Sequence, residues 1–159
     1  MRDSNADQLI ADLGERMGVP GLRFGNAGTC QLVFDQRWVV TLVLERGTGR
    51  ILLNCPLCPP LQADGLPAPI LRAMLEANFM GRGIAGAMLS IAPDRRAYLQ
   101  IQLPLREAGE AGLRDVLESF LNQAETWAAR LEVAPDSTIA QPEVKRASHT
   151  QPAWAMQRV

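Results

Sequence analysis

The feature that most constrains the fold is a change of apolar period between Leu71 and Leu105. Apolar residues recur at helical spacing up to Phe79, whereas Leu99 and Ile101 alternate with polar neighbours. The first pattern is typical of an amphipathic helix and the second of a half-buried strand. The segment therefore predicts the end of a helix, a turn and a strand hairpin.

Glycines separate these two patterns, and they also match a nucleotide-binding fingerprint. Gly81, Gly83 and Gly86 have the spacing G-x-G-x-x-G. A dinucleotide site needs a strand before such glycines and a helix that begins among them, so that helix amides meet the pyrophosphate. The predicted order here is helix and then strand. We therefore interpret the glycines as a turn and predict no bound cofactor.

The remaining periodicities predict an α+β fold with the order α-β-β-β-α-β-β-α, in which helices cover a twisted antiparallel sheet. Residues 1–132 form this domain, and residues 133–159 are expected to be a flexible C-terminal tail, because they are poor in periodic apolar residues. The expected elements are a first helix capped by Ser4 or Asn5 and stopped by Gly18, strands at 30–35, 37–45 and 50–55, a connector between Pro56 and Pro69, a second helix opened by Pro67 or Pro69, a hairpin about residues 93–95, and a third helix over 113–131.

Composition excludes several classes of partner. The chain has 159 residues and a formal net charge of -1, from 16 Lys and Arg against 17 Asp and Glu, so no basic field favours nucleic acid. It has no apolar run of transmembrane length and no pattern of a signal peptide at its N-terminus. Three cysteines without an export signal favour a reducing compartment. We predict a cytoplasmic protein that binds neither nucleic acid nor membrane.

No catalytic or metal site is predicted. Cys55 and Cys58 have the C-x-x-C spacing, but prolines follow them where a thioredoxin-like site needs a helix, and a zinc site needs further ligands. The only histidine, His149, lies in the expected tail. We interpret the two cysteines as small apolar residues at a strand end. A thiol enzyme that uses them is the competing hypothesis.

The strand at 37–45 carries large apolar residues on both of its faces. Two alternatives follow. Helices cover the sheet on both faces, or part of its apolar surface is left over and becomes a subunit interface or a peptide-binding surface. Periodicity alone leaves both open.

Several local patterns, in this order and spacing, resemble the class I type III secretion chaperones related to the Tir chaperone. The likeness covers roughly residues 5 to 132. The patterns are Leu13-Gly14 at the end of the first helix, CQLVFD (30–35), LRAMLEANF (71–79) before the glycine turn, AMLSIAPD (87–94) before YLQIQLPL (98–105), and LESFLNQAETWAARL (117–131).

The resemblance implies a small cytoplasmic bacterial homodimer without enzymatic activity. Such chaperones hold the N-terminal segment of an effector extended, soluble and competent for export. A contact with the export ATPase of the secretion apparatus stays open. By analogy, the proposed dimer residues are Leu71, Met74, Leu75, Phe79 and Met88. The proposed effector-binding residues are Leu9, Leu13, Met17, Leu32, Phe34, Trp38 and Val40.

Two features depart from the family pattern, and one alternative function remains. The chain is nearly neutral where the family is often acidic, and its tail, with Trp154 and Met156, is longer than the family core requires. The alternative is a regulatory interaction module of the same fold that sequesters a transcriptional regulator or another secretion-system component.

Overall fold

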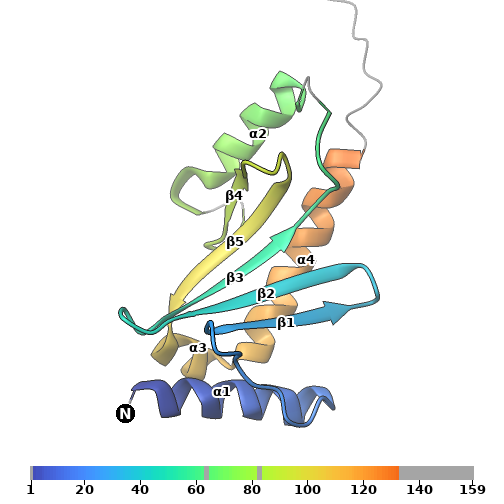
Figure 1. Ribbon diagram of the computed structural model, residues 1–159. Coiled ribbons are helices and arrows are strands. Elements are labelled where there is room, and N and C mark those ends of the chain that lie inside the picture. Colours follow the sequence, from blue (N-terminus) through green and yellow to red (C-terminus); the bar gives the residue numbers. More distant parts are fainter. Residues whose placement is uncertain (1, 63–64, 82–83, 133–159) are drawn as a thin grey trace, which may run out of the picture.

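The computed structural model describes residues 2–62, 65–81 and 84–132, and the predicted tail at 133–159 lies outside them. It confirms the predicted α+β class and order of elements, and it adds one short helix. The elements are α1 (Arg2–Met17), β1 (Thr29–Phe34), β2 (Trp38–Glu45), β3 (Arg50–Pro56), α2 (Ala68–Asn78), the 3-10 turn η1 (Phe79–Gly81), β4 (Met88–Ile91), β5 (Ala97–Pro104), α3 (Leu105–Ala111) and α4 (Leu113–Glu132) (Figure 1).

The five strands form one antiparallel sheet in the order β1-β2-β3-β5-β4. The first three strands are the predicted meander, and β5 pairs with β3 through partners such as Leu53 and Ile101. The late hairpin therefore joins the sheet through its second strand. As a result β1 and β4, which lie far apart in the sequence, are the two edges of the sheet.

Tight turns fix the register of the meander. Asp35 and Gln36 both have positive φ, and the amide of Arg37 donates to the carbonyl of Phe34 at 3.0 Å. Such turns match the right-handed twist of paired strands. The short connection predicted at Asp35-Gln36 is therefore confirmed, and it pairs Phe34 with Trp38.

Helix α1 begins at Arg2, before the predicted caps Ser4 and Asn5, because the apolar spacing gives no signal for its first turn. Gly18 ends it with a φ of +71°, as predicted. Gly14 has a separate role: a Cβ atom there would lie 2.6 Å from the carbonyl oxygen of Val19. Only glycine lets the chain fold back so closely on the helix.

The glycine turn between α2 and β4 has the predicted order of elements, a helix before the glycines and a strand after them. Pro67 caps α2, which is followed by η1 and then by β4, so the glycines follow a helix and precede a strand. The amide of Gly86 donates to the carbonyl of Gly81 at 3.0 Å, and a Cβ atom on Gly81 would lie 3.1 Å from Cα of Gly86. Gly83 lies outside the described residues.

Helix α3 was missed by the sequence prediction. It spans only seven residues, too few to show a helical apolar period, and it contains Gly109. Gly112, with a φ of +77°, separates it from α4, and its carbonyl accepts the amides of Asp115 and Val116. The predicted third helix is α4, and its apolar stripe is buried at Leu113, Leu117, Phe120, Ala124, Trp127, Ala128 and Leu131, whereas Leu121 is half-buried.

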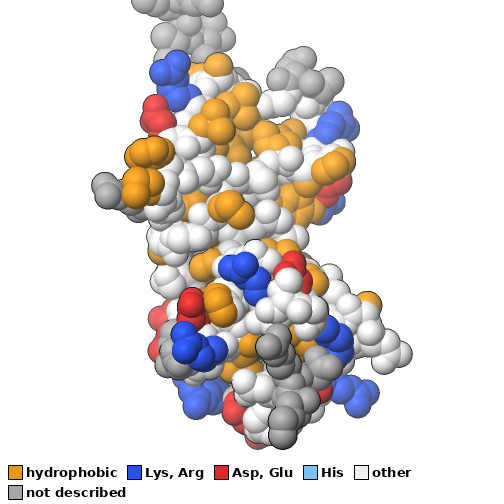
Figure 2. Space-filling model, turned by 90° about the vertical axis from the view of Figure 1, so that its left-hand side faces the viewer, with side chains coloured by type: hydrophobic (Ala, Val, Ile, Leu, Met, Phe, Trp, Pro, Cys, Tyr) orange, Lys and Arg blue, Asp and Glu red, His pale blue; other side chains and the backbone are white. Residues whose placement is uncertain are grey.

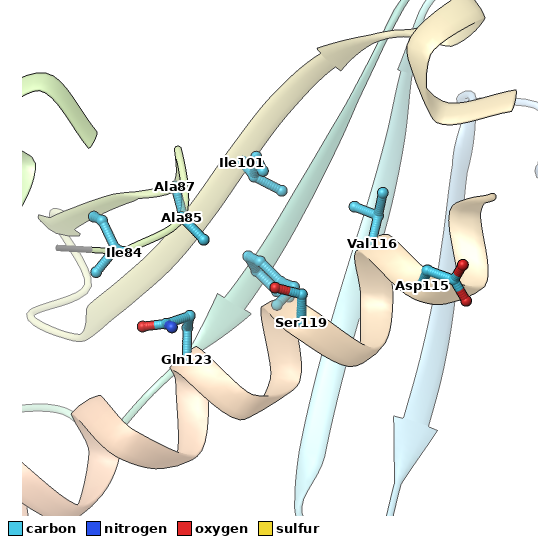
Figure 3. A pocket seen from close by; sticks show the side chains of 9 residues that line it. Ile84, Ala85, Ala87, Ile101, Asp115, Val116, Ser119 and Gln123 are labelled. Carbon is cyan, nitrogen blue, oxygen red and sulfur yellow. The ribbon is translucent and has the colours of Figure 1, made fainter. Parts of the chain in front are cut away.

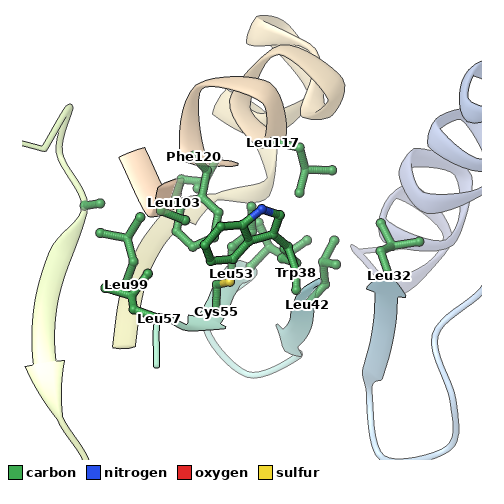
Figure 4. Close-up of a cluster of buried hydrophobic side chains, with 14 of the residues drawn as sticks. Leu32, Trp38, Leu42, Leu53, Cys55, Leu57, Leu99, Leu103, Leu117 and Phe120 are labelled. Carbon is green, nitrogen blue, oxygen red and sulfur yellow. The ribbon is translucent and has the colours of Figure 1, made fainter. Parts of the chain in front are cut away.

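One face of the sheet carries the hydrophobic core. Along β2 the residues from Trp38 to Leu44 on one face are buried, and those on the other face are only half-buried. Helix α4 lies over the buried face, where Leu53, Leu117 and Phe120 meet (Figure 4). Helix α2 packs on β4 rather than over the middle of the sheet. The alternative in which helices cover both faces is therefore not what the structure shows.

Candidate partner-binding surfaces

The largest exposed apolar side chains gather at the end of the molecule formed by α2, η1 and β4. Leu75 is 72% exposed, and Phe79 and Met80 are each 70% exposed. Large apolar side chains are rarely left in water in such a group, so the cluster marks an interaction surface. We call it the α2 patch, and it gathers in the upper part of Figure 2: Leu71, Leu75, Phe79, Met80, Met88 and Ile91.

The α2 patch contains four of the five residues predicted for the dimer interface. The fifth, Met74, is 4% exposed and faces the core of its own chain, because it lies on the inner side of α2. Met80 and Ile91 were missed. Ile91 has the same alternation signal as a core strand residue, and Met80 lies in the glycine turn, where no period exists.

The β4 edge of the sheet is closed by a side chain. The carboxamide nitrogen of Asn78 donates to the carbonyl oxygen of Leu89 at 2.9 Å, and its oxygen accepts the Leu89 amide at 2.8 Å. Asn78 is the last residue of α2, so one side chain ends the helix and ties it to the strand. It fills the two backbone positions that an added strand would use at Leu89.

The β1 edge is open in the middle of the strand. The amide of Leu44 donates to the carbonyl of Gly28, so alternation along an antiparallel pair directs the backbone groups of Cys30 and Leu32 toward β2. The amides and carbonyls of Gln31 and Val33 therefore point away from the sheet. Within the described residues, no backbone hydrogen bond to either of these edge positions is found.

An ion pair holds the tip of the β1–β2 hairpin. The guanidinium of Arg37 lies 2.8 Å from the carboxylate of Glu132 at the end of α4, and it stacks 4.6 Å above the ring of Trp38. Both charged side chains are exposed, so the ion pair contributes at most about 1 kcal/mol. Its effect is positional, since it fixes the open edge relative to α4.

A groove lies between α1 and the α3–α4 region, and we call it the α1 groove. It consists of two adjoining hollows that share Arg16 and Arg114. The first hollow is lined by Leu9, Asp12, Leu13, Arg16, Gly109, Gly112, Leu113 and Arg114. The second is lined by Arg16, Met17, Phe34, Arg114, Leu117, Glu118 and Leu121.

The α1 groove brings together four of the seven residues predicted to bind an effector. Leu9, Met17 and Phe34 are partly buried and pack against the core from its margin. Leu13 lines the groove floor with only 2% exposure. The other three, Leu32, Trp38 and Val40, are buried. Figure 4 shows Trp38 in the core beneath α4. A core strand residue and a groove residue have the same sequence pattern, so the sequence could not separate them.

A third hollow of about 290 Å³ lies where the segment before β4 meets α4. Ile84, Ala87 and Ile101 face Val116 across it, and Gln123 and Ser119 stand at its rim (Figure 3). Among the described residues its lining is mainly apolar, with Asp115 as the one charged side chain, and these residues include no pairing of a nucleophile with a base.

Cys30 and Cys55 lack the environment of reactive thiols. Burial raises the pKa of the Cys55 thiol to about 11 and also raises the pKa of Cys30. Since the thiolate is the nucleophile, a raised pKa keeps Cys55 inert at neutral pH. In the ranges that the structure describes, no group of three or more His, Cys, Asp or Glu residues could hold a metal ion. None of the described helices combines the length and apolar character needed to span a membrane.

Chains of several solved complexes share this fold. The chain is similar to a chain of the ExsC-ExsE complex, with a TM-score of 0.69, 24% identity, and coverage of 81% of this chain and 95% of that one. For a chain of the HopA1-SchA chaperone-effector complex the TM-score is 0.66 with 19% identity, and the match covers 80% of this chain and 95% of that one. For the Yersinia pestis type III secretion chaperone SycH in complex with a fragment of YscM2 the TM-score is 0.60 with 19% identity, and the match covers 76% of this chain and 98% of that one.

The family is shown by the sequence. No curated protein matches the chain. The model of the Tir chaperone protein (CesT) family matches residues 8–128, which is more than half of the chain. This match confirms the predicted resemblance to the Tir chaperones and, with it, the prediction of a chaperone rather than an enzyme. The chain belongs to the Tir chaperone protein (CesT) family.

Proposed function

We propose that this chain is a cytoplasmic, homodimeric bacterial chaperone that holds the N-terminal segment of a type III effector extended beside α1 and β1. The observation that carries the proposal is the open β1 edge next to the α1 groove. Phe34, at the end of β1, lines that groove together with Met17 of α1. A segment that pairs with the edge can therefore place side chains in the groove.

This arrangement would bind a partner without catalysing a reaction. Backbone hydrogen bonds at Gln31 and Val33 are independent of the partner's sequence, whereas the groove selects side chains by shape and polarity. The bound segment would stay extended because the edge accepts only a strand. Such a complex keeps apolar effector residues out of water until delivery, and the export ATPase is the further partner that it would meet there.

The α2 patch supports the dimer. Its six apolar residues come from α2, η1 and β4, and they lie apart from the α1 groove. Burying a large apolar side chain stabilises an interface by about 1.5–3 kcal/mol. A second copy of the chain that covers this patch would leave both grooves of the dimer free for effector.

Affinity capture from cells grown under secretion-inducing conditions, followed by mass spectrometry, identifies the client. The client is then co-expressed with the chaperone and treated with protease. We expect a protected fragment from its N-terminal part. Met17→Glu should abolish this protection because it places a charge in the groove. Val19→Glu is the matched control, since Val19 is exposed just beyond α1 and does not line the groove.

Two results would count against the proposal. A stable monomer that protects no secreted protein would contradict it. Recovery of a transcriptional regulator without any secreted partner would support the alternative function of sequestration.

A further inference from the structure

Two arginines stand where the two hollows of the α1 groove meet. Arg16 comes from the last turn of α1 and Arg114 from the first turn of α4, and each lines both hollows. Both side chains are exposed. Among the residues that the structure describes, neither guanidinium makes a hydrogen bond or an ion pair. The groove therefore presents two positive charges where the two hollows meet, and each hollow also has one carboxylate in its otherwise mainly apolar lining, Asp12 in the first and Glu118 in the second.

Carboxylates lie nearby but do not neutralise these arginines directly. Asp12 is four residues before Arg16 on α1, and Glu118 is four residues after Arg114 on α4, which is the spacing of a helical ion pair. Neither pair is formed. Asp12 instead accepts a hydrogen bond of 2.7 Å from the carboxamide of Gln8, on the side away from the groove junction. The donors of both guanidinium groups stay available to a ligand.

The length of the groove determines how far apart the ligand side chains that occupy its two hollows must be. Leu9 and Met17 lie in different hollows and are eight residues apart on α1, or about 12 Å at about 1.5 Å per residue. An extended peptide rises about 3.3 Å per residue and places alternate side chains on one face, so about four residues span this distance. Residues i and i+4 of the peptide would occupy the hollows, and residue i+2 would face the junction.

We propose that the α1 groove selects an extended segment of the form apolar-x-acidic-x-apolar, whose Asp or Glu is held between Arg16 and Arg114. This inference rests on the proposed function and names the chemistry of its client segment. The guanidinium fork suits a carboxylate, because it donates two parallel hydrogen bonds. Basic side chains at the same position would be repelled, so the arginines also exclude the wrong segments.

A peptide library tests the inference without knowledge of the client. A phage library of random 12-residue peptides is selected on the full-length protein, and enriched peptides are measured by fluorescence anisotropy. We expect apolar residues at i and i+4 with Asp or Glu at i+2. Exchange of this acidic residue for its amide should weaken binding to the wild type by about tenfold, as loss of a charged hydrogen bond does.

The variant Arg16→Gln/Arg114→Gln should bind the acidic peptide and its amide equally, because the selecting charges are gone. Arg23→Gln/Arg50→Gln makes the same change in net charge at exposed positions outside the groove, and it should retain the tenfold preference. Thermal unfolding of both variants checks that they are folded.

The outcomes separate this inference from the proposed function. Enrichment of the apolar pair without an acidic preference, or an equal preference in the arginine variant, would overturn the inference and leave the chaperone function standing. Failure of the folded wild type to enrich any apolar pair would overturn the groove as a binding site and the inference with it.

Discussion

The two edge strands of the sheet differ in whether their outward-facing backbone groups have hydrogen-bond partners. At β4 the side chain of Asn78 takes both backbone groups of Leu89, and helix α2 lies against the strand. At β1 the backbone groups of Gln31 and Val33 have no such cover, and a groove follows the neighbouring helix. An uncovered edge invites strand pairing, and proteins usually protect it. Among the residues that the structure describes, this chain protects one edge and leaves the other uncovered, and the uncovered edge is the one that we propose for a partner.

The comparison extends to the apolar surface beside each edge. The α2 patch beside β4 consists of exposed side chains, which suit a surface that another folded face covers. The α1 groove beside β1 has half-buried apolar side chains such as Leu9, Met17 and Phe34 at its margin, which suit single side chains of an extended segment. The closed end is suited to self-association and the open end to a client.

The largest expected effect is on the dimer that we propose. Leu75→Glu/Phe79→Glu puts two charges into the α2 patch and removes about 3–6 kcal/mol of apolar burial, which should weaken the dimer by more than 100-fold. Light scattering at micromolar concentration should give the mass of one chain instead of two. Glu76→Gln, on the same helix, is the control and should stay dimeric. A double variant that keeps the mass of two chains would place the interface elsewhere.

The second largest effect is expected when the side chain that closes the β4 edge is removed. Asn78→Ala leaves the amide and carbonyl of Leu89 without partners, which should lower the free energy of unfolding by about 1–3 kcal/mol. Asn78→Asp keeps an acceptor for the amide, but its carboxyl can donate to the carbonyl only when it is protonated, so the loss of unfolding free energy should be smaller at a pH where the carboxyl is protonated. Equal stability of wild type and Asn78→Ala would show that this closure contributes nothing.

A smaller effect is expected when the open edge is blocked. Val33→Pro removes an amide that points away from β2, and proline is tolerated at such edge positions. Binding of the client should weaken by about tenfold, because one hydrogen bond to the added strand is lost, while the melting temperature changes little. Val33→Thr keeps the amide and is the matched control. Unchanged affinity of the proline variant would argue against strand pairing at β1.

The smallest effect concerns Cys55, and it appears only at high pH. Burial raises its pKa to about 11 from an ordinary value near 9.0, so the folded state favours the neutral thiol. This contribution to stability is full below pH 9 and is lost as the pH rises toward 11. The free energy of unfolding, measured with urea, should therefore decline more steeply between pH 9 and pH 11 for the wild type than for Cys55→Ala. If the free energies of unfolding of the wild type and of Cys55→Ala changed in parallel with pH, Cys55 would not be held neutral by burial.

The sequence predicted the elements that have a clear period. The stripe of α4, the meander and the glycine turn after α2 were all identified correctly, because each is fixed by local spacing or by a backbone that glycine permits. Helix α3 was missed because seven residues show no period. Its absence from the prediction also hid one wall of the α1 groove, to which Gly109 contributes.

The sites were harder to predict because they depend on tertiary packing. Val40 and Leu9 are both apolar residues in regular elements, yet Val40 is fully buried and Leu9 lines the groove. The closure of β4 depends on a contact between Asn78 and Leu89, eleven residues apart, and the sequence marks Asn78 only as a helix end. Likewise, Arg16 and Arg114 meet only because α1 and α4 pack together.

Hydrogen exchange of backbone amides in the free chaperone and in its purified client complex tests the central claim most directly. The claim is that the open β1 edge pairs with an extended client segment. In the free protein, the amides of Gln31 and Val33 should exchange rapidly and the amide of Leu89 slowly. In the complex, Gln31 and Val33 should become protected while Leu89 changes little. Unchanged exchange at Gln31 and Val33 in a complex that holds the client would contradict the account.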